Sequence, residues 1–139
     1  AYDVCPDNEF AKEYKVTYVE LEHLVKESDF ITLHLPATPE TKHMFNSKHL
    51  SRMKPTAYLI NTSRGDVIDE IALYEVLKSG KLSGAALDVF EVEPPINKEL
   101  MNLANVVCTP HIGAQTKEAQ DLASRVIAEK VIQILRGVI

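Results

Sequence analysis

The chain has 139 residues, of which 15 are basic and 20 acidic, so its net charge is −5. Apolar residues make up 45% and charged residues 25%, the composition of an ordinary globular domain. The acidic balance leaves no basic stripe to neutralise phosphates, and no apolar run approaches the length of a membrane span. We therefore expect one cytoplasmic domain that binds neither nucleic acid nor a membrane.

The first half of the chain alternates short apolar runs with amphipathic ones. This pattern predicts strands at residues 1–4, 16–18, 30–33 and 57–60. It predicts helices at residues 6–14, 20–27 and 47–53. Prolines at positions 36 and 39 stop the third strand.

The second half repeats this rhythm. Asp69 can cap a helix that runs to about Ser79, and Gly80 ends it. Strands are predicted at 84–88 and 106–108, on either side of an acidic, proline-rich loop. From 116 to 136 apolar residues recur at spacings of three and four, which predicts a long helix with one buried stripe.

Short strands separated by helices indicate a doubly wound, Rossmann-like α/β fold with a parallel sheet. The chain has five glycines, and none lies two residues from another, so no glycine-rich phosphate loop follows a strand. We therefore expect residues 1–139 to lack the first strand–helix unit of such a fold.

Cysteine and histidine positions indicate neither a disulfide framework nor a metal site. Cys5 and Cys108 form no CxxC pair, and we expect both to be reduced and mostly buried. His23, His43 and His49 have no partners at metal-ligand spacing and are interpreted as surface residues, so no metal is expected.

In an open α/β sheet, ligands bind beyond the carboxyl ends of the strands. Polar side chains follow several of the predicted strands at this rim. They are Asp3, His34, the segment 61–65 with Arg64, Asp88 with Glu91 and Glu93, and His111. An arginine, acids and a histidine are thus expected at one edge of the sheet.

Each of these residues also has a simpler interpretation. Arg64 could form a surface ion pair, and Glu91 and Glu93 could be solvated loop charges. His111 could be a core histidine bonded to a backbone carbonyl, and Asp3 could cap the helix that follows it.

Four blocks of sequence are more specific than any single residue. Asn61–Gly65, residues 84–90 with the Glu93–Pro94 pair, and residues 109–114 resemble the signature blocks of the D-2-hydroxyacid dehydrogenase family. Residues 33–42 look like a further block of that family. The resemblance covers nearly the whole chain, and the spacing is most similar to the phosphoglycerate dehydrogenase branch.

The resemblance implies a role for particular residues. Arg64, Glu93 and His111 match the catalytic trio, and Asp3 matches the acid that holds the adenosine ribose. Positions near the dinucleotide are matched by Leu35, Pro36, Thr62, Ser63, Asp88, Ile112, Gly113 and Ala114, together with Arg64 and His111.

The chemistry of these residue types suits a 2-hydroxy acid. The planar guanidinium of Arg64 can hold a carboxylate through two hydrogen bonds. A histidine is a suitable base for the hydroxyl proton, and a carboxylate beside it fixes its tautomer. The Asp3 carboxylate would accept from ribose hydroxyls and repel a 2′-phosphate, so we expect NAD rather than NADP.

The expectation is therefore a partial NAD-binding domain, residues 1–139, without a substrate domain. It would belong to an NAD-dependent oxidoreductase acting on a D-2-hydroxy or 2-oxo acid, with D-3-phosphoglycerate as the first candidate. A hydroxypyruvate or glyoxylate reductase, a non-catalytic NAD-sensing scaffold similar to corepressors, and an inactive fragment remain open alternatives. The resemblance also implies a homodimer.

Overall fold

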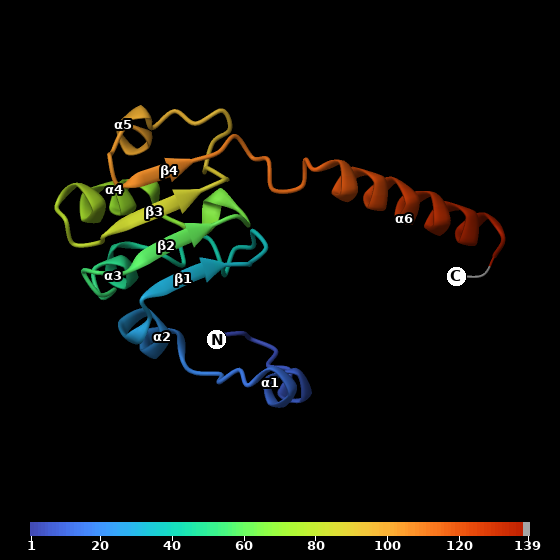
Figure 1. Ribbon diagram of the computed structural model, residues 1–139, viewed down its shortest axis with the longest axis horizontal. Coiled ribbons are helices and arrows are strands. Elements are labelled where there is room, and N and C mark those ends of the chain that lie inside the picture. The colour runs from blue at the N-terminus through green and yellow to red at the C-terminus, as the bar shows by residue number, and fades with distance from the viewer. Residues whose placement is uncertain (138–139) are drawn as a thin grey trace.

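The computed structural model describes residues 1–137 and contains a four-stranded parallel sheet with strand order β1-β2-β3-β4. Neighbouring strands pair in register, Phe30 with Tyr58, Tyr58 with Gly84, and Ala85 with Val106. All four strands point toward one edge, as Figure 1 shows. The strands are β1 (Phe30–Leu33), β2 (Tyr58–Asn61), β3 (Gly84–Leu87) and β4 (Val106–Cys108).

Helices connect these strands and flank them. Short polar side chains cap several helices, and Asp69, for example, accepts a hydrogen bond from the Ala72 N–H as predicted. The helices are α1 (Asn8–Tyr14), α2 (Leu21–Glu27), α3 (Ser47–Leu50), α4 (Glu70–Lys78), α5 (Lys98–Met101) and α6 (Lys117–Leu135), with a 3₁₀ turn, η1, at Gly65–Val67.

The hydrophobic core lies between one face of the sheet and helices α2 to α5. Each of these helices contributes a fully buried side chain, respectively Val25, Leu50, Leu73 and Leu100. Alternate strand residues face them, because successive side chains of a strand point to opposite faces. The strand side of the core includes Ile31, Leu33, Leu59, Ala85 and Leu87.

The opposite face of the sheet is open to solvent within residues 1–137. Phe30, Tyr58 and Val107 are 71%, 45% and 66% exposed. The Phe30 and Tyr58 rings stack on this face with their centroids 5.5 Å apart. The predicted α/β fold with a parallel sheet is therefore confirmed, and the helices of the described chain cover one of its two faces.

The predicted strands at 30–33 and 106–108 are confirmed, and those at 57–60 and 84–88 differ by one residue. The strands predicted at 1–4 and 16–18 are wrong. These segments are linked by two hydrogen bonds, from the Ala1 amine to the Thr17 carbonyl (2.6 Å) and from the Val19 N–H to the Ala1 carbonyl (2.8 Å). A strand requires a continuous ladder, and no further strand among the described residues pairs with either segment.

The long C-terminal helix confirms one prediction and contradicts another. It begins after the Thr116 cap, as its pattern predicts. Its apolar stripe, however, is not buried; Leu122, Ile127 and Leu135 are 61%, 63% and 81% exposed. Figure 1 shows the reason, since α6 extends away from the sheet and packs against no other element of the described chain. Within residues 1–137, no helix combines the length and apolarity that a bilayer crossing requires.

Candidate active site

The site is built at the carboxyl edge of the sheet, where the segments that follow β3 and β4 meet. His111 Nδ1 lies 2.8 Å from Glu93 Oε2. Because a carboxylate only accepts, Nδ1 carries the proton of this hydrogen bond. Nε2 is then the ring nitrogen available for another partner. The predicted pairing of Glu93 with His111 is present in the structure.

The pairing also changes the titration of the acid. The pKa of the Glu93 carboxyl is lowered, first by the hydrogen bond from His111 and then by that from the Phe90 N–H. Glu93 therefore stays ionised near neutral pH. The ionised carboxylate accepts the hydrogen bond from Nδ1–H and so fixes the tautomer of the ring. The pair can accordingly hold or release a proton at Nε2.

The turn that carries His111 is held by Asp88, which is 5% exposed. Asp88 accepts from the Thr109 hydroxyl and from the backbone N–H groups of Ile112 and Gly113, the latter two at 2.9 Å. The Thr109 hydroxyl lowers the pKa of Asp88 most, and the two N–H groups lower it further against the opposing effect of burial. These bonds keep His111, which has a positive φ of 53°, in a left-handed conformation.

Arg64 stands on the segment that follows β2, and Asn61 shapes this segment. Asn61 is 1% exposed; its side chain accepts from the Ser63 N–H and hydroxyl and donates to the Arg64 carbonyl. Arg64 itself is exposed, and its guanidinium donates to the Ser63 carbonyl at 2.6 Å. Among residues 1–137 it forms no ion pair, so the surface-pair interpretation is not supported.

Gly65 connects the arginine segment to the segment of the acid. A Cβ atom placed on Gly65 would lie 1.9 Å from the Phe90 carbonyl carbon and 2.4 Å from the Glu91 nitrogen. Only glycine permits two backbones to approach this closely. Arg64 is therefore held directly beside the loop that leads to Glu93.

An apolar cavity of about 420 Å³ adjoins the histidine pair. Glu93 and His111 line one part of it, so its contents can reach both groups. Cys108 lines it as well, and burial raises the pKa of its thiol. The remaining lining residues are Phe90, Pro94, Pro95, Met101, Thr109 and Pro110.

A second cavity, of about 410 Å³, lies between the N-terminal segment and β1. Asp3 and Leu35 are among its lining residues. Asp3 Oδ1 accepts from the Cys5 N–H at 2.8 Å, whereas Asp7 caps α1, so the alternative role of Asp3 as that cap is wrong. A carboxylate with accepting capacity at a strand-end cavity fits the ribose hydroxyls of a dinucleotide.

The other expected cofactor positions lie on the same edge. Thr62, Ile112, Gly113 and Ala114 are exposed there, and Pro36 is exposed after β1. Leu35 and Ser63 are partly buried. The structure thus brings Arg64, Glu93 and His111 onto adjacent segments and places Asp3 at a separate cavity.

Several side chains have hydrogen-bond partners or a degree of exposure that the sequence does not indicate. Glu91 pairs with His43, at 3.0 Å, rather than being a solvated charge. His49 is also engaged, since its Nδ1 lies 2.6 Å from the Met44 carbonyl. The sequence does not indicate these hydrogen-bond partners, and His49, whose side chain is 14% exposed, is more buried than expected of a surface residue. Cys5 and Cys108 are free as expected, but Cys5 is exposed.

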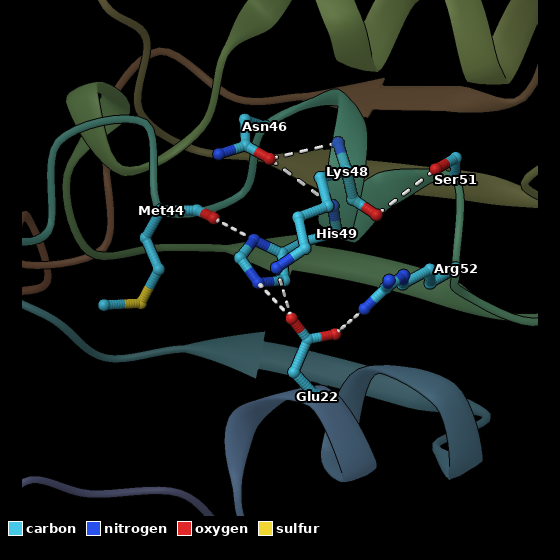
Figure 2. Close-up of polar contacts among 7 residues, drawn as sticks. All are labelled: Glu22, Met44, Asn46, Lys48, His49, Ser51 and Arg52. Carbon is cyan, nitrogen blue, oxygen red and sulfur yellow. Dashed lines mark hydrogen bonds and ion pairs between the residues drawn. The ribbon is translucent and has the colours of Figure 1, made fainter.

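His49 belongs to a cluster of polar side chains that is centred on Glu22. Figure 2 shows that this cluster joins α2 to α3. The Glu22 carboxylate pairs with Lys48 at 2.6 Å and with Arg52, and it lies 3.8 Å from His49. These contacts lower the pKa of Glu22, the hydrogen bond from Lys48 most. The cluster involves none of the residues at the carboxyl edge.

Comparison with known proteins shows the family of the chain. The sequence model described as "D-isomer specific 2-hydroxyacid dehydrogenase, NAD binding domain" matches residues 1–113. The chain belongs to this family. It provides the NAD-binding domain of that family.

Curated relatives have different activities. A D-3-phosphoglycerate dehydrogenase of Methanocaldococcus jannaschii is 47% identical over 98% of this chain and 26% of its own length. A glyoxylate reductase of Thermococcus litoralis is 51% identical over 93% of this chain and 39% of its own. The chain thus spans between a quarter and two-fifths of the length of these two relatives.

Solved structures of the family share the fold. The NAD-complexed D-isomer specific 2-hydroxyacid dehydrogenase of Lactobacillus delbrueckii ssp. bulgaricus superposes with a TM-score of 0.90 at 33% identity, covering 98% of this chain and 45% of that one. A D-lactate dehydrogenase of Aquifex aeolicus, in complex with NAD and lactic acid, gives 0.87 at 39% identity with the same coverage.

Proposed function

We propose that a protein carrying this domain is an NAD-dependent oxidoreductase that transfers a hydride between nicotinamide and a D-2-hydroxy acid. The observation that carries the proposal is the 2.8 Å contact between Glu93 and His111. On the neighbouring strand end, Arg64 is exposed and forms no ion pair among the described residues. A proton acceptor and a carboxylate-binding group on adjacent strand ends suit the oxidation of a 2-hydroxy acid.

Arg64 is proposed to bind the substrate carboxylate. Its guanidinium presents a planar set of N–H donors, which match the two oxygens of a carboxylate. Binding that group orients the neighbouring carbon that loses or gains hydride. Asn61 supports this role because it shapes the backbone on either side of Arg64.

His111 is proposed to exchange the hydroxyl proton of the substrate at Nε2. In oxidation it accepts the proton as the hydride leaves, and in reduction it donates one to the keto oxygen. Glu93 holds the proton on Nδ1 and stabilises the positive charge that the ring gains. Proton transfer of this kind contributes about 10²–10⁴ in rate.

NAD supplies the hydride acceptor when bound, and this chain contributes residues to hold it. Asp3 is proposed to accept hydrogen bonds from the adenosine ribose, and its negative charge would oppose a 2′-phosphate. The turn at 112–114 and the side chains of Thr62 and Ser63 are proposed to lie near the nicotinamide. NAD is therefore preferred over NADP.

D-3-phosphoglycerate is the first candidate substrate, with glyoxylate or hydroxypyruvate second. Spacing within the chain supports the first choice, and a relative that is 51% identical, a glyoxylate reductase, supports the second. We also propose that the protein contains a separate substrate domain, forms a homodimer and acts in the cytoplasm. The relatives' greater length supports the additional domain.

Steady-state assays of the complete protein with NADH and a panel of 2-oxo acids test the proposal. The panel contains 3-phosphohydroxypyruvate, hydroxypyruvate, glyoxylate and pyruvate. Arg64→Ala should lower kcat/KM by about 10²-fold or more on the best substrate, because an orienting contact is lost. Arg64→Lys should recover only part of that loss.

Arg52→Ala is the matched control, since Arg52 pairs with Glu22 far from the site. It should leave kcat/KM unchanged. Wild-type protein that binds NADH but reduces no acid would instead favour the non-catalytic scaffold. An Arg64→Ala variant with native kcat/KM would show that the arginine does not bind the substrate.

A further inference from the structure

A network of three side chains lies behind the catalytic segments without belonging to the trio. Glu91 and Glu70 exchange hydrogen bonds. The Glu70 N–H donates to Glu91 Oε1 at 2.9 Å, and the Glu91 N–H donates to Glu70 Oε1 at 2.7 Å. Each carboxylate thus binds the backbone of the other residue, which joins the start of α4 to the loop after β3.

His43 completes the network from a third segment. Its Nε2 lies 3.0 Å from Glu91 Oε2, so both oxygens of Glu91 are engaged. His43 has a φ of 49°, and its N–H donates to the Asp66 carbonyl at 2.7 Å. The isolated bridge between Phe45 and Ile68 continues this contact between the two segments.

The residues of this network lie close in sequence to the proposed catalytic residues. Glu70 lies six residues after Arg64, across η1, and Glu91 lies two residues before Glu93. Gly65, next to Arg64, packs directly on the backbone of Phe90 and Glu91. The Phe90 N–H in turn donates to Glu93 Oε1 at 3.2 Å. A shift of Glu91 is therefore transmitted to Glu93 on one side and to the arginine segment on the other.

Two partly buried carboxylates side by side need a reason, because their charges repel. Burial raises the pKa of Glu70; the hydrogen bond from the Glu91 N–H opposes this effect, and the charge of Glu91 adds to it. Folding alone would favour neutral side chains at these positions. The paired acids are better explained by the geometry that they impose on the two loops.

We propose that Glu91, supported by His43 and Glu70, is a positioning residue that holds Glu93 against His111 and fixes this pair relative to Arg64. This inference rests on the proposed function. Its structural part, the placement of Glu93, can also be measured without turnover.

The experiment compares three variants of the complete protein in steady-state kinetics with NADH and the best 2-oxo acid. Glu91→Ala removes both side-chain hydrogen bonds and should lower kcat by about 10- to 100-fold, because small displacements of a reacting group are costly. Glu91→Gln keeps an oxygen for the Glu70 N–H and should stay within about threefold of the wild type. His43→Asn tolerates the positive φ and removes the imidazole, and it should lower kcat by about three- to tenfold.

The second readout is the carboxyl titration of Glu93, followed by ¹³C NMR. In the wild type the pKa of Glu93 is lowered by His111. In Glu91→Ala it should move up toward its ordinary value, because the contact with His111 is loosened. A general loss of stability would not shift the titration of a folded protein.

Glu22→Ala is the matched control, since Glu22 also joins two segments through a histidine and basic partners (Figure 2). It should lower the unfolding midpoint and leave both kcat and the Glu93 titration unchanged. Equal losses of kcat in Glu22→Ala and Glu91→Ala would overturn the inference, as would native kcat and an unshifted Glu93 in Glu91→Ala.

His43→Asn keeps the test decisive if Glu91→Ala does not fold. In that variant too, native kcat and an unshifted Glu93 would overturn the inference. A wild type that reduces no acid would refute the proposed function, and the Glu93 titration alone would then decide the positioning role.

Discussion

Individual residues at the carboxyl edge act mainly by fixing backbone segments. Asp88 binds the turn of His111, and Asn61 binds the segment of Arg64. Both are at least 95% buried, so their polar groups must be bonded, and the segments they bind are correspondingly rigid. The proposed catalytic side chains themselves remain accessible on these rigid supports.

Gly65→Ala should destabilise the protein by about 1–3 kcal/mol, because the new methyl group would overlap the Phe90 backbone. It should also lower kcat, since relief of the overlap separates Arg64 from Glu93. Thermal unfolding and steady-state kinetics measure the two effects.

Gly80→Ala is the control for this change. Gly80 has a φ of +71° and no atom within 4 Å of an added Cβ, so alanine is strained but not crowded. Gly80→Ala should lower the stability of the protein by about 1–2 kcal/mol and leave kcat unchanged. Native stability and kcat in Gly65→Ala would contradict the close approach of the two segments.

The lowered pKa of Asp88 leads to a prediction of how the stability of the protein depends on pH. This pKa is lowered in the folded state, so the stability that Asp88 contributes is present above the unfolded value of about 3.9 and is lost as the pH falls through the folded value. Asp88→Asn should be less stable at pH 7 by about 1–3 kcal/mol, because one N–H acceptor is lost.

Urea unfolding between pH 7 and pH 3 checks this prediction. The wild-type free energy of unfolding should fall more steeply with acid than that of Asp88→Asn, so the two curves should converge at low pH. Parallel curves would show that the turn does not depend on an ionised Asp88.

Sequence patterns locate the residues of the trio but not the residues that support them. Strand-end positions follow from apolar runs, so the amino-acid sequence is enough to place Arg64 and His111 at one rim. His43 and Glu91 are 48 residues apart, and no periodicity links a loop histidine to a loop acid at that distance. The Thr109 hydroxyl on Asp88 is hidden from sequence patterns for the same reason.

For helices and strands, an amphipathic pattern predicts that an element forms, but it does not predict what that element packs against. The spacing of apolar residues in α6 is that of a buried helix, and its boundaries are predicted within one residue. Burial depends on a second surface, which the described chain does not place against it. The segments 1–4 and 16–18 show the same limit for strands, because each has a strand-like pattern but forms no strand.

Removal of α6 should leave the sheet domain intact. A chain ending at Thr116 should unfold with a free energy within about 0.5 kcal/mol of the full 139 residues, because α6 buries no side chain. Leu100→Ala in α5 is the contrasting variant, since Leu100 is fully buried and its truncation should cost about 2–5 kcal/mol. A loss above about 2 kcal/mol on removing α6 would show that the helix packs on the domain.

Across the molecule as a whole, the open sheet face is the dominant feature. Phe30, Tyr58 and Val107 form an exposed apolar surface opposite the helical layer. Exposed apolar patches of this kind are typical of surfaces that are covered by another part of a protein or by a partner. Composition alone does not reveal such a face, because it depends on which strands have helices on both sides.

The 139-residue chain should therefore self-associate as its concentration rises. Phe30→Lys combined with Val107→Lys should reduce association by about tenfold or more in Kd, since two charges would be buried in the contact. Sedimentation velocity measures this, and Ile71→Lys is the control because Ile71 is 74% exposed on α4. Equal effects of the two variants would show that the sheet face is not the contact.

The proposed reaction depends above all on His111, which, paired with Glu93, moves the proton that accompanies hydride transfer. This role is measured by the single-turnover rate of NADH oxidation by the complete protein with its best 2-oxo acid, in wild type and His111→Asn. Asparagine tolerates the left-handed backbone at this position, so the turn is retained. We expect native NADH binding in the variant, with a rate lowered by about 10²–10⁴. An unchanged rate would show that His111 does not carry the proton.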